Sequence, residues 1–158
     1  MSNTELPVND PLCALFRRTR AIAVVGLSPK EDRPSFDVAR YLQGAGFRIY
    51  PINPQHAGSI ILGEPVLPSL DALAQRGAEV EIVNIFRRPE AAGAVVDEAI
   101  MALAGQGLAC VWMQLGVIDR AAAARAEAAG LLAVMDRCTK IEHARLLASG
   151  CPDLSHPV

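Results

Sequence analysis

The chain has 158 residues, of which 51% are hydrophobic and 20% are charged, so it is long enough to bury one core and too apolar to be disordered. Its formal net charge of -2 argues against a general nucleic-acid or membrane-surface binder, and no segment approaches the roughly 18 apolar residues of a membrane span. Because no basic region followed by an apolar run opens the chain, we expect a cytoplasmic protein of one domain.

The N-terminal segment, residues 1–20, is predicted to contain one short helix. Asn9 or Asp10 can cap it, and Pro11 suits its first position because that position needs no N–H donor. The apolar residues of the segment fall on one helical face, which we expect to pack against a sheet. They are Leu12, Leu15 and Phe16.

A buried strand, a turn and a helix start follow. Five apolar residues, 21–25, end at Gly26, where we expect a close backbone approach, and a polar loop leads to a helix that opens with Pro34 and Ser35. We interpret Ser35 as the cap of this helix. In an open parallel sheet such a turn lies at the carboxyl edge, where a helix N-terminus favours a phosphate. Lys30 and Arg33 add positive charge there.

The rest of the chain alternates between strand and helix patterns. Ser69, Pro89 and Asp119 mark helix starts, and Thr139 with Glu142 has the T-x-x-E spacing of a capping box that opens a last helix. Residues 53–68 contain three prolines and two glycines, which predicts a loop with at most a short extended piece. Further strands are predicted at residues 47–52, 80–86, 109–115 and 131–135.

This alternation predicts the α/β class, with a Rossmann-like, doubly wound, parallel five-stranded sheet. We expect a single domain over residues 21–147. Residues 148–158 show no periodicity, so we expect them to form a loose C-terminal tail.

The cysteines are far apart in the sequence and include no C-x-x-C, so we expect reduced thiols rather than a zinc site or a disulfide framework. They are Cys13, Cys110, Cys138 and Cys151. Cys138 and His143 both follow the last predicted strand, with Lys140 between them, which leaves a nucleophilic cysteine as an alternative.

The first turn argues against an NAD-type dinucleotide. Gly26 is its only glycine, so G-x-G-x-x-G is absent, and the strand at 47–52 is followed by Asn53 rather than by the acid that usually binds a ribose diol. We interpret His56 as an exposed loop residue. Basic or weakly basic groups nevertheless recur after three predicted strands: Lys30 and Arg33, then His56, then Arg87 and Arg88. A ligand with several phosphates would use them, and coenzyme A, with a pyrophosphate and a separate 3′-phosphate, fits this pattern.

Six segments in order carry a resemblance to a known family: VVGLSPKEDRPSFDVARYL, YPINPQ, ILGEPVLPSL, NIFRRPE, VWMQLGVI and VMDRCTKIEH. They are similar to the small bacterial and archaeal CoA-binding proteins of the succinyl-CoA-synthetase-like type, from about residue 20 to residue 147. The resemblance implies binding of CoA or an acyl-CoA. Because the synthetase needs a second domain and a partner subunit for its chemistry, we expect a non-catalytic binding module here.

The resemblance also implies ligand contacts. The family's glycine-rich turn corresponds to Gly26, Leu27 and Ser28, and its proline-bearing strand end corresponds to Phe86 through Pro89. Phosphate contacts are implied near Ser28, Lys30, Arg33, Pro34 and Ser35. Adenosine or pantetheine contacts are implied near Asn53, Pro54, Arg87, Arg88, Gln114, Leu115 and Gly116. A further hypothesis is a mixed disulfide between Cys138 and the thiol of CoA.

Two other classes of function remain open, an NAD(H)-binding regulatory module and a small thiol-dependent enzyme that uses Cys138. We expect no metal, nucleic-acid or membrane partner. The apolar face of the N-terminal helix and the sheet edges could support a homodimer.

Overall fold

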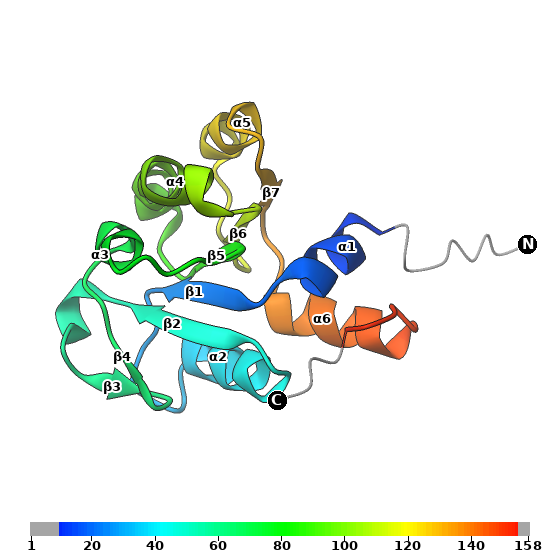
Figure 1. Cartoon of the computed structure of the whole chain (residues 1–158), viewed down its shortest axis with the longest axis horizontal. Helices are drawn as coiled ribbons and strands as arrows, with labels where there is room; N and C mark the ends of the chain where they lie inside the picture. Colours follow the sequence, from blue (N-terminus) through cyan, green and yellow to red (C-terminus); the bar gives the residue numbers. More distant parts are fainter. Residues whose placement is uncertain (1–9, 155–158) are drawn as a thin grey trace, which may run out of the picture.

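The computed structural model describes residues 10–154, which form a five-stranded parallel sheet in the order β2-β1-β5-β6-β7 (Figure 1). All four neighbouring strand pairs are parallel. The predicted α/β class and five-stranded sheet are therefore confirmed. The strands are β1 (Ala21–Val25), β2 (Arg48–Ile52), β5 (Ile82–Ile85), β6 (Cys110–Met113) and β7 (Leu132–Val134).

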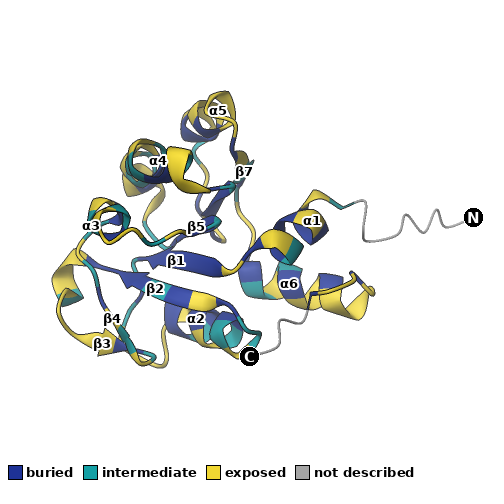
Figure 2. Cartoon of the chain, viewed as in Figure 1, coloured by how far each residue is buried: buried dark blue, intermediate teal, exposed yellow. Residues whose placement is uncertain are grey.

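Helices cover both faces of the sheet, which is why the strands are almost continuously apolar. Side chains alternate between the two faces, so Ile22 and Val24 of β1 join one core cluster while Ala23 and Val25 join the other. Figure 2 shows the central strands β1 and β5 buried and the helices exposed on their outer sides. One face carries α1 (Pro11–Arg18), α2 (Pro34–Gly44) and α6 (Thr139–Ala148), and the other carries α3 (Leu70–Gln75), α4 (Pro89–Leu103) and α5 (Arg120–Ala128) (Figure 1).

The segment expected to be a loop between residues 53 and 68 runs beside the edge strand β2. It contains the 3₁₀ turn η2 (Pro54–His56) and a hairpin of β3 (Ile60–Ile61) and β4 (Glu64–Pro65). The segment returns to β2 through two backbone hydrogen bonds, from Asn53 N–H to the Leu67 carbonyl (2.9 Å) and from Leu67 N–H to the Pro51 carbonyl (3.0 Å). A second 3₁₀ turn, η3 (Ala104–Gln106), follows α4.

Three predicted helix caps are confirmed. The side chains of Asp10, Ser69 and Asp119 accept hydrogen bonds from backbone N–H groups two or three residues further on, at 2.9 to 3.1 Å. These side chains satisfy donors that have no partner inside the helix. The alternative cap, Asn9, lies outside the described residues.

Two predicted caps are wrong. Arg33 precedes α2 and makes no side-chain capping bond, while Ser35 lies in the first turn with its hydroxyl turned back to the preceding loop. Cys138 precedes α6, and Thr139 is already helical and points into the core. In both cases the helix already includes the predicted cap residue, so its hydroxyl lies inside the first turn and bonds to another part of the chain.

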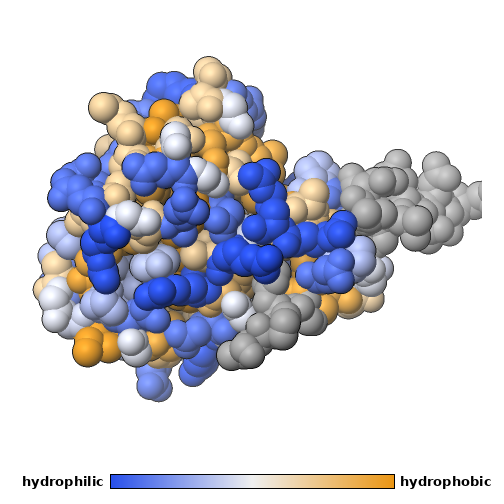
Figure 3. All heavy atoms as spheres, viewed as in Figure 1, coloured by the Kyte–Doolittle hydropathy of each residue, from blue (hydrophilic) through white to orange (hydrophobic). Residues whose placement is uncertain are grey.

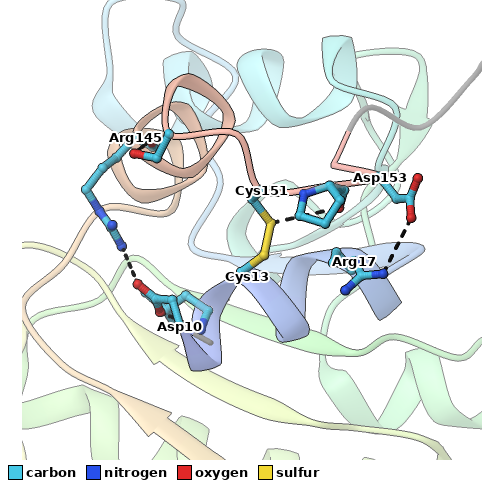
Figure 4. Close-up of a disulfide and its surroundings, with 9 residues drawn as sticks. Asp10, Cys13, Arg17, Arg145, Cys151 and Asp153 are labelled. Atoms are coloured by element: carbon cyan, nitrogen blue, oxygen red, sulfur yellow. Dashed lines mark hydrogen bonds and ion pairs between the residues drawn. A yellow bond between two sulfur atoms is a disulfide. The ribbon is translucent and has the colours of Figure 1, made fainter. Parts of the chain in front are cut away.

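The expectation of four reduced thiols is wrong for Cys13 and Cys151, which form a disulfide with 6.0 Å between their Cα atoms (Figure 4). The bond joins α1 to the segment after α6, and ion pairs lie on either side of it: Arg145 with Asp10 (3.1 Å) and Arg17 with Asp153 (3.4 Å). Cys110 and Cys138 are free. The sequence gives no sign of the pairing because the two cysteines are 138 residues apart.

The C-terminal segment differs from the loose tail that we expected. Its residues Cys151 and Leu154 are buried, with 5% and 1% of their surfaces exposed. Residues 155–158 lie outside the described part.

Within residues 10–154, no helix combines the length and the apolar character needed to cross a membrane. On the face seen in Figure 3, hydrophobic areas are scattered among hydrophilic side chains.

Candidate functional site

A cleft of about 430 Å³ opens at the carboxyl ends of β1 and β5. This is the point where the strand order reverses, because β2 lies on one side of β1 and the later strands follow on the other. Open α/β sheets bind ligands at such switch points. Nine of the residues expected at the site line this cleft: Gly26, Ser28, Lys30, Arg33, Pro34, Ser35, Asn53, Phe86 and Arg87. Gln55 and His56 also line it.

Gly26 allows the ends of β1 and β5 to meet at the floor of the cleft. Its φ is +87°, and a Cβ there would lie 2.1 Å from the carbonyl oxygen of Phe86. Backbone hydrogen bonds of 2.8 Å hold both strand ends, from Gly26 N–H to the Ile52 carbonyl and from Phe86 N–H to the Val25 carbonyl. The close approach expected at Gly26 is therefore made by a neighbouring strand.

The loop after β1 folds back onto the first turn of α2. Ser28 N–H donates to the Ser35 hydroxyl (3.0 Å), and Lys30 N–H donates to the Ser28 hydroxyl (3.1 Å). Since both hydroxyl oxygens act as acceptors here, their own hydrogens can be donated to an anion in the cleft. The partial positive charge at the N-terminus of α2 favours the same guest.

Asn53 connects the end of β2 to the loop after β1. Its side-chain amide donates to the Leu27 carbonyl (3.1 Å), and its side-chain oxygen accepts from Gln55 N–H (3.0 Å). Asn53 is 7% exposed and Leu27 is fully buried. Asn53 therefore lines the cleft and holds the loop, whereas Leu27 is buried and does not line it. Asn53 stands where an NAD site usually has an acid.

The cleft is strongly cationic. Lys30 and Arg33 enter it from the loop after β1, Arg87 enters from the end of β5, and no Asp or Glu lines it. Within residues 10–154, none of these three cations forms an ion pair. Three like charges without a counter-ion repel one another, so an anion bound among them is favoured.

A second cleft, of about 510 Å³, lies beside α6 and contains other expected residues. Leu115 and Cys138 line it, with Leu115 60% exposed and Cys138 buried. Gly116 lies next to Leu115 and donates its N–H to the Asp136 carboxylate (2.7 Å). Unlike the first cleft, this one is lined by side chains of both charges: Asp10, Asp136 and Glu142 are acidic, and Arg137 and Arg145 are basic. Ile141 also lines it.

Gln114 lies just below this edge and is almost completely buried. Its amide donates to the Asn84 side-chain oxygen (2.8 Å) and to the Thr139 hydroxyl (3.1 Å), and the Asn84 amide also donates to Thr139 (3.0 Å). This network ties β5 and β6 to the start of α6. The sequence analysis did not predict a role for Asn84. Its single amide in the apolar segment IVNIF could have indicated a buried network, because a buried amide requires hydrogen-bond partners.

The structure gives no support to a nucleophilic pair of Cys138 and His143. His143 is buried, and its Nδ1 lies 2.9 Å from the Tyr41 hydroxyl. Its ring meets Phe16, Tyr41 and Phe47 edge-on, with centroids 5.3 to 5.5 Å apart. These contacts make His143 a packing residue between α1, α2 and α6.

Five expected site residues line neither cleft: Leu27, Gln114 and Gly116, described above, and Pro54 and Arg88. Pro54 is an exposed residue of η2, and Arg88 is an exposed residue at the N-cap of α4. Within the described part, no cluster of three or more His, Cys, Asp or Glu side chains could hold a metal ion.

The fold and the cleft together define a Rossmann-like α/β domain of the class that binds ligands at the carboxyl edge of its sheet. Residues 20–144 match the family described as CoA binding domain, and the chain belongs to this family. The resemblance that we inferred from six segments is thereby confirmed.

The relatives have similar lengths, and the two with solved structures have similar folds. The uncharacterized protein YneT of Bacillus subtilis is 34% identical over 138 residues, covering 87% of this chain and 96% of its own length. The crystal structure of Prb, the PH1109 protein redesigned for binding, is 34% identical, with a TM-score of 0.76 over 86% of this chain and 89% of that one. A Thermus thermophilus structure, cell-free ID.343, is 31% identical, with a TM-score of 0.75 over 85% and 96%.

Proposed function

We propose that this chain binds coenzyme A or an acyl-CoA, with the phosphate groups held in the cleft between β1 and β5. The observation that carries the proposal is the charge of this cleft, where Lys30, Arg33 and Arg87 converge without a carboxylate. Membership of the CoA binding domain family supports the same ligand. The Ser28 and Ser35 hydroxyls supply neutral donors for phosphate oxygens.

The pantetheine arm would run along the carboxyl edge toward the second cleft. Neighbouring strands are about 4.8 Å apart, so the ends of β6 and β7 lie roughly 7 Å and 12 Å from the switch point between β1 and β5. An extended arm spans these distances, which would bring the thiol or acyl end near Leu115 and Cys138. This path keeps Leu115, Gly116 and Cys138 as predicted contacts, whereas the side chain of Gln114 is committed to the network with Asn84 and Thr139. A mixed disulfide at Cys138 would appear as a CoA adduct by mass spectrometry under oxidising conditions.

We infer a binding role without chemistry of its own. The residues that line the first cleft supply charge and hydrogen-bond donors. In the one histidine–cysteine pair considered from the sequence, the Nδ1 atom of His143 is engaged by the Tyr41 hydroxyl. A homodimer stays a prediction, to be checked by light scattering at the protein concentration used for binding.

The test is isothermal titration of ligand-stripped protein with CoA, dephospho-CoA and NAD. We expect CoA to bind most tightly, because it alone adds a 3′-phosphate to a pyrophosphate. Arg33→Ala and Arg87→Ala should each weaken CoA binding, while Arg18→Ala, which removes an exposed arginine of α1 outside the cleft, should leave the affinity unchanged. Tighter binding of NAD, or no CoA binding at millimolar ligand, would overturn the proposal.

A further inference from the structure

His56 belongs to the cationic cleft, although its sequence context suggested an exposed loop residue. It ends the turn η2, is partly buried, and lines the same cleft as Lys30 and Arg33. Histidine is the side chain whose charge ordinarily changes between pH 5 and 8. Lysine and arginine side chains ordinarily stay charged throughout that range.

The turn that carries His56 is held by its own hydrogen bonds. His56 N–H donates to the Asn53 carbonyl (3.2 Å), and the Ser59 hydroxyl donates to the His56 carbonyl (2.6 Å). The Asn53 side chain caps the same turn through Gln55 N–H. These hydrogen bonds hold the backbone of His56 at the cleft wall.

The charged groups around His56 make an anion the natural partner of its protonated ring. The cleft presents Lys30 and Arg33 from one element and Arg87 from another, and it contains no carboxylate. In the hairpin that follows η2, Glu64 is paired with Arg48 (3.6 Å). A bound phosphate would therefore supply the negative charge that favours the imidazolium.

We propose that His56 is a fourth phosphate-binding residue of this cleft and that it acts in its protonated form. The inference rests on the proposed function and adds a pH dependence to it, because His56 would bind a proton when CoA binds. The affinity for CoA therefore gains a contribution on the acid side of neutrality that is lost on the alkaline side.

The experiment compares the dissociation constants of CoA for the wild type, His56→Gln and His56→Lys at about pH 6 and about pH 8. The 3′-phosphate of CoA titrates in this range too, so the comparison is made between proteins at one pH, where the ligand is the same. At the lower pH we expect His56→Gln to bind roughly three- to tenfold more weakly than the wild type, the size of one charge-assisted hydrogen bond in a half-exposed cleft. At the higher pH the two should agree within about twofold, and His56→Lys should bind tightly at both.

A matched control comes from the same turn. Gln55 also lines the cleft and does not titrate, so any loss of affinity in Gln55→Ala should be the same at both pH values. Thermal denaturation of each variant checks that the fold is retained. Titration with dephospho-CoA shows which phosphate His56 contacts: the effect disappears if it is the 3′-phosphate and persists if it is the pyrophosphate.

The two possible failures are distinguishable. If the wild type binds CoA but the ratio between wild type and His56→Gln is the same at both pH values, the role of His56 is overturned and the proposed function stands. If the wild type binds no CoA at either pH, the proposed function fails and this inference fails with it.

Discussion

Replacing Gly26 with alanine tests the close approach of β1 and β5 that forms the floor of the cleft. A Cβ at this position would lie 2.1 Å from the Phe86 carbonyl oxygen, whereas ordinary contacts begin at 3.4 Å. Because the obstacle is a backbone atom, the two strand ends must separate by more than an ångström. The positive φ of Gly26 adds a second penalty, since an L side chain disfavours it.

The expected loss of stability combines these two effects. The positive φ costs alanine about 1–2 kcal/mol. The clash displaces Phe86 and Gly26, which disturbs the hydrogen bond from Phe86 N–H to Val25, between β5 and β1, and the bond from Gly26 N–H to Ile52, between β1 and β2, each worth about 1 kcal/mol net. We therefore expect Gly26→Ala to lower the free energy of unfolding by about 3–4 kcal/mol.

Urea denaturation followed by the fluorescence of Trp112, the single and fully buried tryptophan, measures this loss. Gly63→Ala is the matched control, because Gly63 has a φ of +78° and a Cβ there would meet no atom within 4 Å, so this variant carries the φ penalty alone. Equal losses in the two variants would refute the close approach. Gly26→Ala should also weaken CoA binding, because Phe86 and Arg87 move with the end of β5.

Two further predictions concern the disulfide and an ion pair. The Cys13 to Cys151 disulfide closes a loop of 138 residues, for which the chain-entropy relation gives a stabilisation of up to about 5 kcal/mol. We therefore expect Cys151→Ser to lower the free energy of unfolding, measured in urea, by about 2–5 kcal/mol. Reductant should not lower the stability of this variant further. Cys138→Ser keeps the bond and should still respond to reductant, whereas four free thiols in the intact native protein would contradict the pairing. The hydrogen bond from Lys140 to Asp37 (2.8 Å) lowers the pKa of the Asp37 carboxyl, with a smaller effect of Arg40. The ionised carboxylate therefore stabilises the fold above about pH 4, and this contribution is lost as the pH falls through the lowered pKa. Lys140→Gln should raise the pKa of Asp37 toward its usual value in an NMR titration, and an unchanged pKa would show that the contact is not made in solution.

Much of the fold follows from interactions between near neighbours in the chain, which a sequence displays directly. The caps at Asp10, Ser69 and Asp119 need only an N–H group two or three residues away. The alternation of apolar strands with helical stripes likewise predicts a parallel sheet, and parallel strands bring their carboxyl ends to one edge. That rule alone placed Lys30, Arg33 and Arg87 in one cleft.

Other features depend on partners that only the packed structure brings together. The hydroxyl of Thr139 belongs to a network with Asn84, 55 residues earlier, rather than to a capping box. Gln114 turns into that same network, and Cys13 meets Cys151 across nearly the whole chain. His56 joins the cationic cleft because the turn after β2 folds toward the ends of β1 and β5. The amino-acid sequence thus determined the strands, most helix starts and the charge of the site, since those depend on local hydrogen bonding and hydrophobic periodicity. Tertiary packing decided which polar side chains face the ligand cleft and which satisfy buried partners, because that choice depends on atoms far away in the sequence.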